Sequence, residues 1–273
     1  MNAAIFSKPA KGLILASGLI AASSIMGYAQ DAPVALGAQA TVPLSAYYVS
    51  PPSGITSLGD CTINACHSFD LTGGNLVQLS NGQHVTYTGS WTNASGAYLL
   101  LNSVNTYFWY DQSVVGNVTI TFSDGTTQST DLMVGGNIRE WRTGAGFTVN
   151  TLSDPAAANV WTGSAQPGMG GGTAVIDMLS ITLPAKTVTS ITLNDVNDFG
   201  ALRIDLAGLT MNQKPTCIMP GNSCNTPAAT NSQAPQHAKS ANFTGSSPSQ
   251  GKSSKSADAG MNTPAMTGKP PTN

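Results

Sequence analysis

The sequence predicts an all-β protein, an antiparallel β-sandwich of the jelly-roll type followed by a disordered C-terminal tail. In residues 118–122, Val118, Ile120 and Phe122 alternate with polar residues, which places them on one face of a strand. The Asp124-Gly125 pair readily takes the positive φ angles of a tight turn, so this run and the next, which ends at Val134, are predicted to form an antiparallel hairpin. Similar alternating runs recur further along the chain, whereas no segment after residue 29 shows the period of an amphipathic helix.

The strands follow in order between glycine-, proline- and asparagine-containing turns. The run Tyr98-Leu-Leu-Leu101 is continuously apolar, which is typical of a strand buried on both faces. Residues 142–172 read as one long irregular stretch, and loops of that length are usually functional or mobile. The strands are predicted at 44–49, 68–71, 84–88, 97–104, 117–134, 173–183, 187–193 and 201–210.

The N-terminal 29 residues have the pattern of a secretory signal peptide. Lys8 and Lys11 precede a short apolar run, and small residues at Gly27 and Ala29 fit a cleavage site after Ala29. The apolar run is interrupted and too short for a membrane anchor, which needs about 20 apolar residues. We therefore expect a secreted, extracellular or periplasmic protein without a membrane span, with a flexible lead-in at 30–43, the sandwich at 44–211 and the tail at 212–273.

Charge excludes one class of partner. Residues 30–211 contain four basic and twelve acidic residues, a net charge of −8. This part of the chain lacks the basic surface that binds phosphates, so nucleic acid is not an expected partner. Residues 212–273 are dominated by Ser, Pro, Ala, Gly, Asn and Lys. Such a composition cannot bury enough apolar surface to offset the entropy of the chain, which predicts a disordered tail.

The chain contains four cysteines, and an exported protein favours disulfides. Four cysteines allow three pairings. The local pairing, Cys61 with Cys66 and Cys217 with Cys224, is the predicted one. A metal site at Cys61, Cys66 and His67 is the alternative, but this spacing is not a zinc pattern.

The acidic residues offer little chemistry. A typical glycoside hydrolase needs two carboxyl groups on either side of the scissile bond. Glu140 is the only glutamate, and an ion pair beside Arg139 at a strand edge explains it without catalysis, so no enzyme is predicted. Residues 194–198 carry several side-chain oxygens, and Asp195 and Asp198 are candidate ligands for a structural calcium. Asn and Asp are also ordinary turn residues, which leaves a turn without an ion as the alternative. No other cofactor is expected.

The aromatic residues are the strongest candidates for binding. Residues 107–110 form a dense aromatic cluster, in which Tyr107 and Trp109 rank first, and Trp141 and Trp161 flank the long irregular stretch. Exposed aromatic rings stack on the apolar faces of sugars, while polar side chains such as Arg139 orient the hydroxyls. The alternative for each ring is that it fills the core of the sandwich. One alternating strand cannot bury all four aromatics of the cluster on a single face, which favours exposure there.

Four segments, residues 116–126, 136–141, 160–163 and 201–210, resemble the core of the galactose-binding-like jelly-roll modules of bacterial secreted proteins. The resemblance implies a two-sheet jelly roll, often with a structural calcium; many such modules bind carbohydrate, and the resemblance does not imply catalysis. We therefore expect a secreted module that binds a neutral carbohydrate or cell-surface glycan. The alternative is an extracellular structural or surface-associated protein without a glycan ligand, and a glycoside hydrolase is a third hypothesis. Two or more exposed aromatics at one loop end would favour glycan binding over the structural hypothesis.

Overall fold

The computed structural model describes residues 29–63, 65–144, 146–170 and 172–214. The predicted signal peptide, the predicted tail and the predicted Cys217–Cys224 disulfide lie outside these residues, apart from the ends of the two segments at residues 29 and 212–214. Within them strands dominate, which confirms the all-β fold. The helical elements are short 3₁₀ turns, and none in the described part of the chain has the length and apolar character needed to cross a bilayer. They are η1 (Gly37–Gln39), η2 (Leu44–Ala46), η3 (Cys61–Ile63) and η4 (Phe108–Tyr110).

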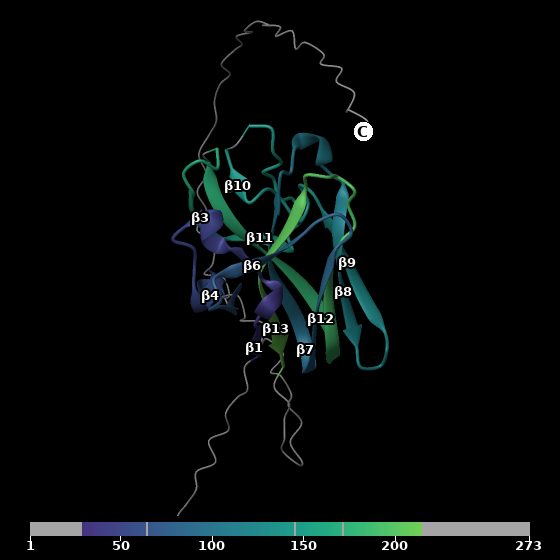
Figure 1. Cartoon of the computed structure of the whole chain (residues 1–273). Helices are drawn as coiled ribbons and strands as arrows, with labels where there is room; N and C mark the ends of the chain where they lie inside the picture. Colours follow the sequence, from purple (N-terminus) through teal and green to yellow (C-terminus); the bar gives the residue numbers. More distant parts are fainter. Residues whose placement is uncertain (1–28, 64, 145, 171, 215–273) are drawn as a thin grey trace, which may run out of the picture. The chain divides into compact units, whose positions relative to one another are not determined.

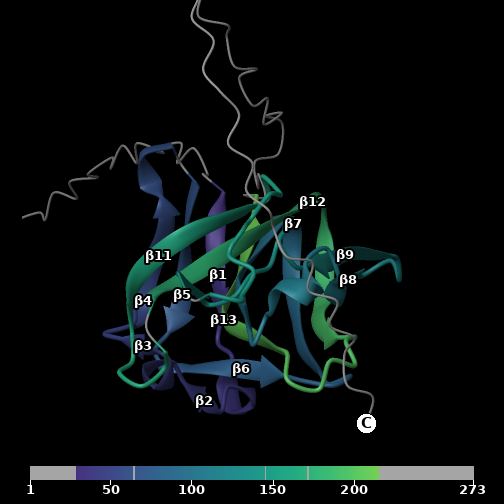
Figure 2. The ribbon, with the colours of Figure 1, turned by 90° about the horizontal axis from the view of Figure 1, so that it is seen from above.

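The strands form one sheet of eleven strands and a separate two-stranded sheet, β4–β5, and all their ladders are antiparallel. Their bounds are β1 (Gln30–Val34), β2 (Val42–Pro43), β3 (Tyr48–Val49), β4 (Gly54–Asp60), β5 (Ala65–Leu71), β6 (Asn75–Leu79), β7 (His84–Val104), β8 (Val114–Phe122), β9 (Thr127–Met133), β10 (Arg142–Thr143), β11 (Ala157–Ala165), β12 (Thr173–Asp195) and β13 (Arg203–Gln213). The arrangement is shown in Figures 1 and 2.

Two long strands, β7 and β12, lie next to each other at the centre of the large sheet. They pair with each other from Met178 opposite Leu100 to Asn194 opposite His84, with breaks in register in the middle of the ladder. Asn93 (φ 54°) and Ala185 (φ 57°) lie next to these breaks, and bulges of this kind bend a strand. The sequence predicted two separate strands in each case, and the structure corrects this because each pair is one continuous, bent strand.

The bend divides the large sheet into two layers. The C-terminal half of β7 pairs with β13, which also pairs with β1 and β6, and the N-terminal half of β12 pairs with β10 and β11. The C-terminal half of β12 instead pairs with β8, which continues to β9. Figure 1 accordingly shows β8 and β9 on one side of the molecule and β3 and β11 on the other.

Two hydrophobic cores lie on opposite faces of the central strands. Leu99 and Leu101 face the first core, between the two layers, whereas Leu100 faces the second. The β4–β5 hairpin contributes Phe69 and Leu71 to this second core. Leu99, Leu100 and Leu101 are at most 1% exposed, which confirms the prediction of a strand buried on both faces.

The predicted hairpin is β8–β9, with Val118 opposite Thr130. Val118, Ile120 and Phe122 all face the first core. Of the two turn residues, Gly125 has a positive φ of 81°, whereas Asp124 closes the turn by accepting hydrogen bonds from the N–H and hydroxyl of Thr126. The turn is therefore not the predicted pair of positive φ angles.

Strands β4 and β6 lie outside the predicted strands, and three further segments differ from the prediction. Residues 30–43 are not a flexible lead-in, because β1 pairs with β13 and β2 pairs with β6. Residues 44–49 form η2 and the short β3 rather than one strand. The stretch 142–172 contains β10 and β11, which pair with β12. In each of these three segments the deciding partner is distant along the chain, so local pattern could not reveal it.

The Cys61–Cys66 disulfide is confirmed, with the two Cα atoms 4.7 Å apart. It closes the connection between β4 and β5, in which η3 lies. His67 follows in β5, where its Nδ1 lies 3.0 Å from Oδ1 of Asp31 in β1. His67 therefore links two strands.

A buried carboxyl group lies in the central sheet. Asp205 on β13 is 2% exposed, and its Oδ1 accepts a hydrogen bond of 2.9 Å from Nε2 of Gln78. Its Oδ2 is buried without a hydrogen-bond partner. Burial raises the pKa of Asp205 to about 7, against the opposing effect of the Gln78 hydrogen bond.

This carboxyl makes the stability of the fold depend on pH. Between the ordinary value of 3.8 and about 7, the unfolded chain loses the Asp205 proton whereas the folded chain keeps it, so stability falls as pH rises through this range. The difference between the pKa of Asp205 in the folded and in the unfolded chain corresponds to a loss of about 4 kcal/mol in the free energy of unfolding across this range. We predict that Asp205→Asn removes this loss and is more stable than the wild type at pH above about 7.

Urea denaturation across this pH range measures the effect. The exposed Asp198→Asn is the matched control, because it makes the same chemical change outside the core. An equal slope for Asp205→Asn and the wild type would contradict the prediction.

Candidate functional site

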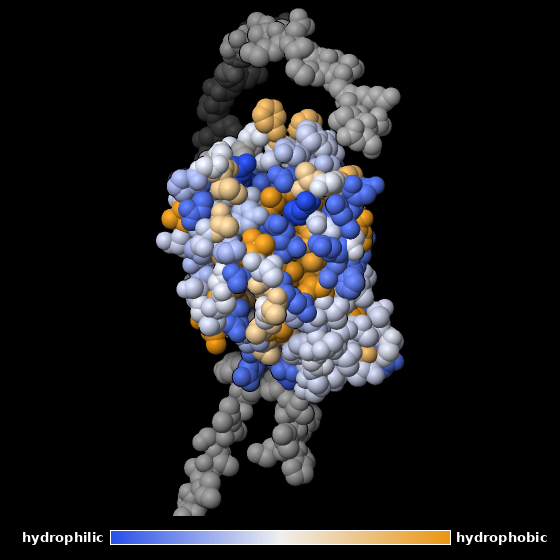
Figure 3. All heavy atoms as spheres, in the orientation of Figure 1, coloured by the Kyte–Doolittle hydropathy of each residue, from blue (hydrophilic) through white to orange (hydrophobic). Residues whose placement is uncertain are grey.

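An exposed aromatic cluster lies at one loop end of the sandwich. We define the aromatic platform as Tyr107, Phe108, Trp109 and Phe147. Phe108 is 60% exposed, Trp109 is 57% exposed and Phe147 is 77% exposed. Figure 3 shows apolar side chains projecting from the loop end at the top of that view. Clustered exposed apolar side chains of this kind mark binding surfaces.

Three of the four platform rings, Tyr107, Phe108 and Trp109, contact one another. Tyr107 and Trp109 stack with their centroids 4.6 Å apart, and Phe108 meets Trp109 edge-on at 5.1 Å. Tyr110 supports the cluster from the inner side, because it packs on the first core and stacks on Phe199 at 4.4 Å. Mutual contact limits the rotamers of these rings, so little conformational entropy remains to be lost when a ligand binds.

The backbone presents Phe147 in an uncommon conformation. Its φ is +80°, a region that a non-glycine residue enters at a cost of about 1–3 kcal/mol. Two links hold it there: the N–H of Phe108 donates to the Phe147 carbonyl at 2.9 Å, and Tyr107 forms a bridge with Thr148. Strain of this kind persists where surrounding structure enforces it, and it is concentrated at functional sites.

A buried polar network anchors the base of the platform. Oε2 of Glu140 accepts a hydrogen bond of 2.8 Å from the N–H of Thr106, whose hydroxyl donates to the Ser103 hydroxyl at 2.6 Å. The N–H of Val149 donates to the Thr106 carbonyl, which ties the segment of Phe147 to the segment of η4. Glu140 thus holds the residue directly before the platform.

Glu140 differs from its prediction in place and partner. It is 2% exposed rather than at a strand edge, and its Oε1 lies 3.9 Å from Nε of Arg142. Burial raises the pKa of Glu140, and the hydrogen bonds from Thr106 oppose this. The sequence suggested Arg139 as partner because the two are adjacent, but adjacent residues of an extended chain point to opposite sides.

Arg139 is instead part of an internal ion pair. Its Nε and Nη2 each donate to one carboxylate oxygen of Asp177 at 2.7 Å. Asn102 and Asn159 donate to the same carboxylate. Four hydrogen bonds therefore satisfy Asp177, and the guanidinium of Arg139 is engaged inside the fold rather than directed to a ligand.

The two remaining tryptophan candidates lie away from the platform. Trp141 is 2% exposed in the second core, so the expectation that its ring is exposed to a ligand is wrong. Trp161 is half-buried, and its ring meets Tyr48 edge-on at 5.6 Å. The Trp161 ring also covers Gly163, where a Cβ atom would collide with it. The Trp141 ring is part of the second core, and the Trp161 ring packs against it.

The candidate calcium ligands have different surroundings. Asp195 is buried, and its Oδ1 accepts hydrogen bonds from the N–H and the side-chain amide of Asn197. Burial raises the pKa of Asp195. Asp198 is exposed. In the described residues, no three His, Cys, Asp or Glu side chains are grouped as a metal site. The geometry is that of an Asx turn.

Phe147 is the platform residue that sequence reasoning missed. It lies in the stretch 142–172 and has no aromatic neighbours in the sequence, so its proximity to η4 is a tertiary feature. The feature of the sequence that could have indicated its exposure is the pair of glycines, Gly144 and Gly146, just before it, because glycines at this spacing are typical of an exposed turn.

Comparison with protein-family models, curated proteins and solved structures found no match to this chain. The likeness to galactose-binding-like modules therefore stays a prediction, and the function has to be argued from the site itself.

Removing the Glu140 carboxylate should weaken the base of the platform. We predict that Glu140→Ala lowers the free energy of unfolding by about 1–3 kcal/mol, because the Thr106 N–H is left buried without an acceptor. Glu140→Gln keeps an acceptor oxygen and should cost less. Urea denaturation of both variants tests this, and an unchanged stability of Glu140→Ala would refute the anchoring role.

Proposed function

We propose that this protein is a secreted, non-catalytic carbohydrate-binding protein that holds a neutral glycan on the aromatic platform. The observation that carries the proposal is the exposure of Phe108, Trp109 and Phe147 at one loop end. This is the arrangement expected to favour glycan binding over a structural role. Sugar rings have apolar C–H faces that stack on aromatic rings, and that contact needs no charge.

Electrostatics supports a neutral ligand. The chain from residue 30 to 211 has a net charge of −8. A polyanion would meet like charge on approach, which raises its free energy near the protein. A neutral polysaccharide meets no such penalty, and stacking removes its apolar C–H faces from water, which is favourable.

Two buried carboxylates of the fold, Glu140 and Asp177, are engaged by structural partners, which supports binding without chemistry. Glu140 is buried and accepts a backbone hydrogen bond below the platform. Asp177 is saturated by Arg139 and two asparagines. Neither group is placed as the acid and base that glycoside hydrolysis requires on the two sides of a sugar.

The disulfide supports the secreted location that the proposal includes. Cys61–Cys66 is typical of a protein that folds in an oxidising environment, outside the cytosol. Glycans at cell surfaces and in extracellular material are the accessible ligands there.

Affinity electrophoresis tests the proposed function. Gels containing mixed-linkage β-glucan, galactomannan or dextran should retard the native protein in at least one case. Trp109→Ala and Phe147→Ala should each weaken the apparent affinity for that polymer by about tenfold, a loss of about 1.4 kcal/mol of stacking.

The matched control is Ile55→Ala, which removes an equally exposed apolar side chain (73%) on β4, outside the platform. It should be retarded like the wild type. Equal migration of the wild type in all polymer gels and in a polymer-free gel would refute glycan binding and favour the structural alternative.

A further inference from the structure

We infer that the groove between β6 and the N-terminal half of β7 is a second subsite for the same neutral glycan chain, so that the protein binds internal segments of a polysaccharide. This inference rests on the proposed function. The groove has a volume of about 640 Å³, within the range of pockets that bind small ligands. Its residues come from η1, β6, the β6–β7 turn and the start of β7.

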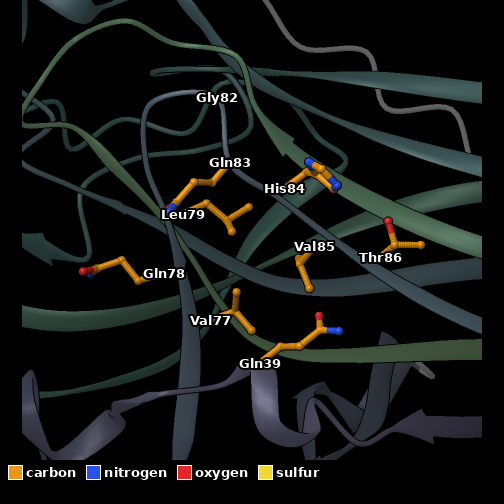
Figure 4. A pocket seen from close by; sticks show the side chains of 9 residues that line it. All are labelled: Gln39, Val77, Gln78, Leu79, Gly82, Gln83, His84, Val85 and Thr86. Carbon is orange, nitrogen blue, oxygen red and sulfur yellow. The ribbon is translucent and has the colours of Figure 1, made fainter.

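The groove exists because two strand edges lie open beside each other. On β6, residues Val77–Leu79 pair with β13 on one side, and β2 reaches only as far as Leu76 on the other. The first residues of β7 pair with β12 alone. Figure 4 shows Val77, Leu79 and Val85 facing the space between these edges. These three side chains belong to the first core and are only 3–4% exposed, so they close the bottom of the groove and offer a ligand little apolar surface.

The polar residues of the groove suit hydroxyl groups. Gln39, Gln83, His84 and Thr86 line it, and no carboxylate, ammonium or guanidinium group does. Among the described residues, the side chains of Gln39 and His84 are exposed and make no hydrogen bond within the protein, which leaves their polar atoms free for a ligand. Gln78, by contrast, points away toward Asp205 (Figure 4).

Uncharged donors and acceptors at the rim of the groove match the hydroxyl groups of a sugar. Figure 3 shows a hollow with apolar atoms among polar ones on the face where β6 lies in Figure 1. A charged ligand would find no counter-charge in the lining, which favours a neutral one.

One short loop, residues 195–199, connects the groove to the aromatic platform. At its start, the N–H of Asp195 donates to the Gln83 carbonyl at 2.9 Å, and at its end Phe199 stacks on Tyr110 beneath the platform. Four residue steps span at most about 14 Å. Val196, between them, is 52% exposed and offers an apolar contact along the way. A glycan chain on the platform can therefore continue along this loop into the groove.

The test is the dependence of affinity on chain length. Disaccharide, tetrasaccharide and octasaccharide fragments of the polymer that retards the wild type are titrated by calorimetry. For the wild type, affinity should rise by about tenfold or more from the shortest to the longest fragment. The double variant Gln39→Ala/His84→Ala should lose this gain while keeping the affinity for the short fragment.

Two controls separate the groove from the platform. Trp109→Ala should weaken binding of every fragment, and Ser129→Ala, an exposed hydroxyl on β9, should change nothing. If the groove variant binds the octasaccharide as tightly as the wild type does, the groove is not a subsite, although the platform function stands. If the wild type binds no fragment and no polymer, both proposals fail.

Discussion

The pairing of β7 with β12, from Leu100 opposite Met178 to His84 opposite Asn194, is the constraint on which the rest of the structure depends. Every other strand of the large sheet joins this pair directly or through one neighbour or two. Because both strands bend at the same level, beside Asn93 and Ala185, one ladder supplies the centre of both layers. The bend also leaves the first half of β7 unpaired on its outer edge, so the groove is a consequence of the architecture rather than of local sequence.

Four acidic residues in the described part of the chain, Glu140, Asp177, Asp195 and Asp205, are buried inside the fold. Asp177 is saturated by a bidentate arginine and two asparagines, whereas Asp205 has one amide donor and an oxygen without a partner. This difference has a consequence for protonation. Hydrogen bonds to both oxygens stabilise a buried carboxylate, whereas burial without such hydrogen bonds raises the pKa of the carboxyl group and favours its protonated form. Burial raises the pKa of Glu140, and the hydrogen bond from the backbone N–H of Thr106 opposes this. The same hydrogen bond positions the segment that leads to the platform.

The side chains of the platform are held in place although they are exposed, a combination that is uncommon for surface residues. Phe108, Trp109 and Phe147 are exposed, yet Trp109 stacks on Tyr107 and meets Tyr110 edge-on, and the backbone beneath these rings is bonded to a buried network. The positive φ of Phe147 adds strain that the bridge to η4 must balance. Such preorganisation suits binding of a stiff ligand, because the protein loses little further freedom on contact. Ordinary surface residues need none of these supports.

Local pattern in the sequence determined the all-β class, the β8–β9 hairpin, the buried run ending at Leu101 and the Cys61–Cys66 disulfide. Each of these follows from alternation, turn residues or short spacing, all of which are local properties. Tertiary structure decided the rest. Nothing local distinguishes the exposed Trp109 from the buried Trp141, because exposure depends on whether another segment covers the ring. The place of Phe147 beside η4, the joining of strand pieces into β7 and β12, and the open edge that forms the groove all arise from pairing between residues distant in the chain, which periodicity in a single segment cannot encode.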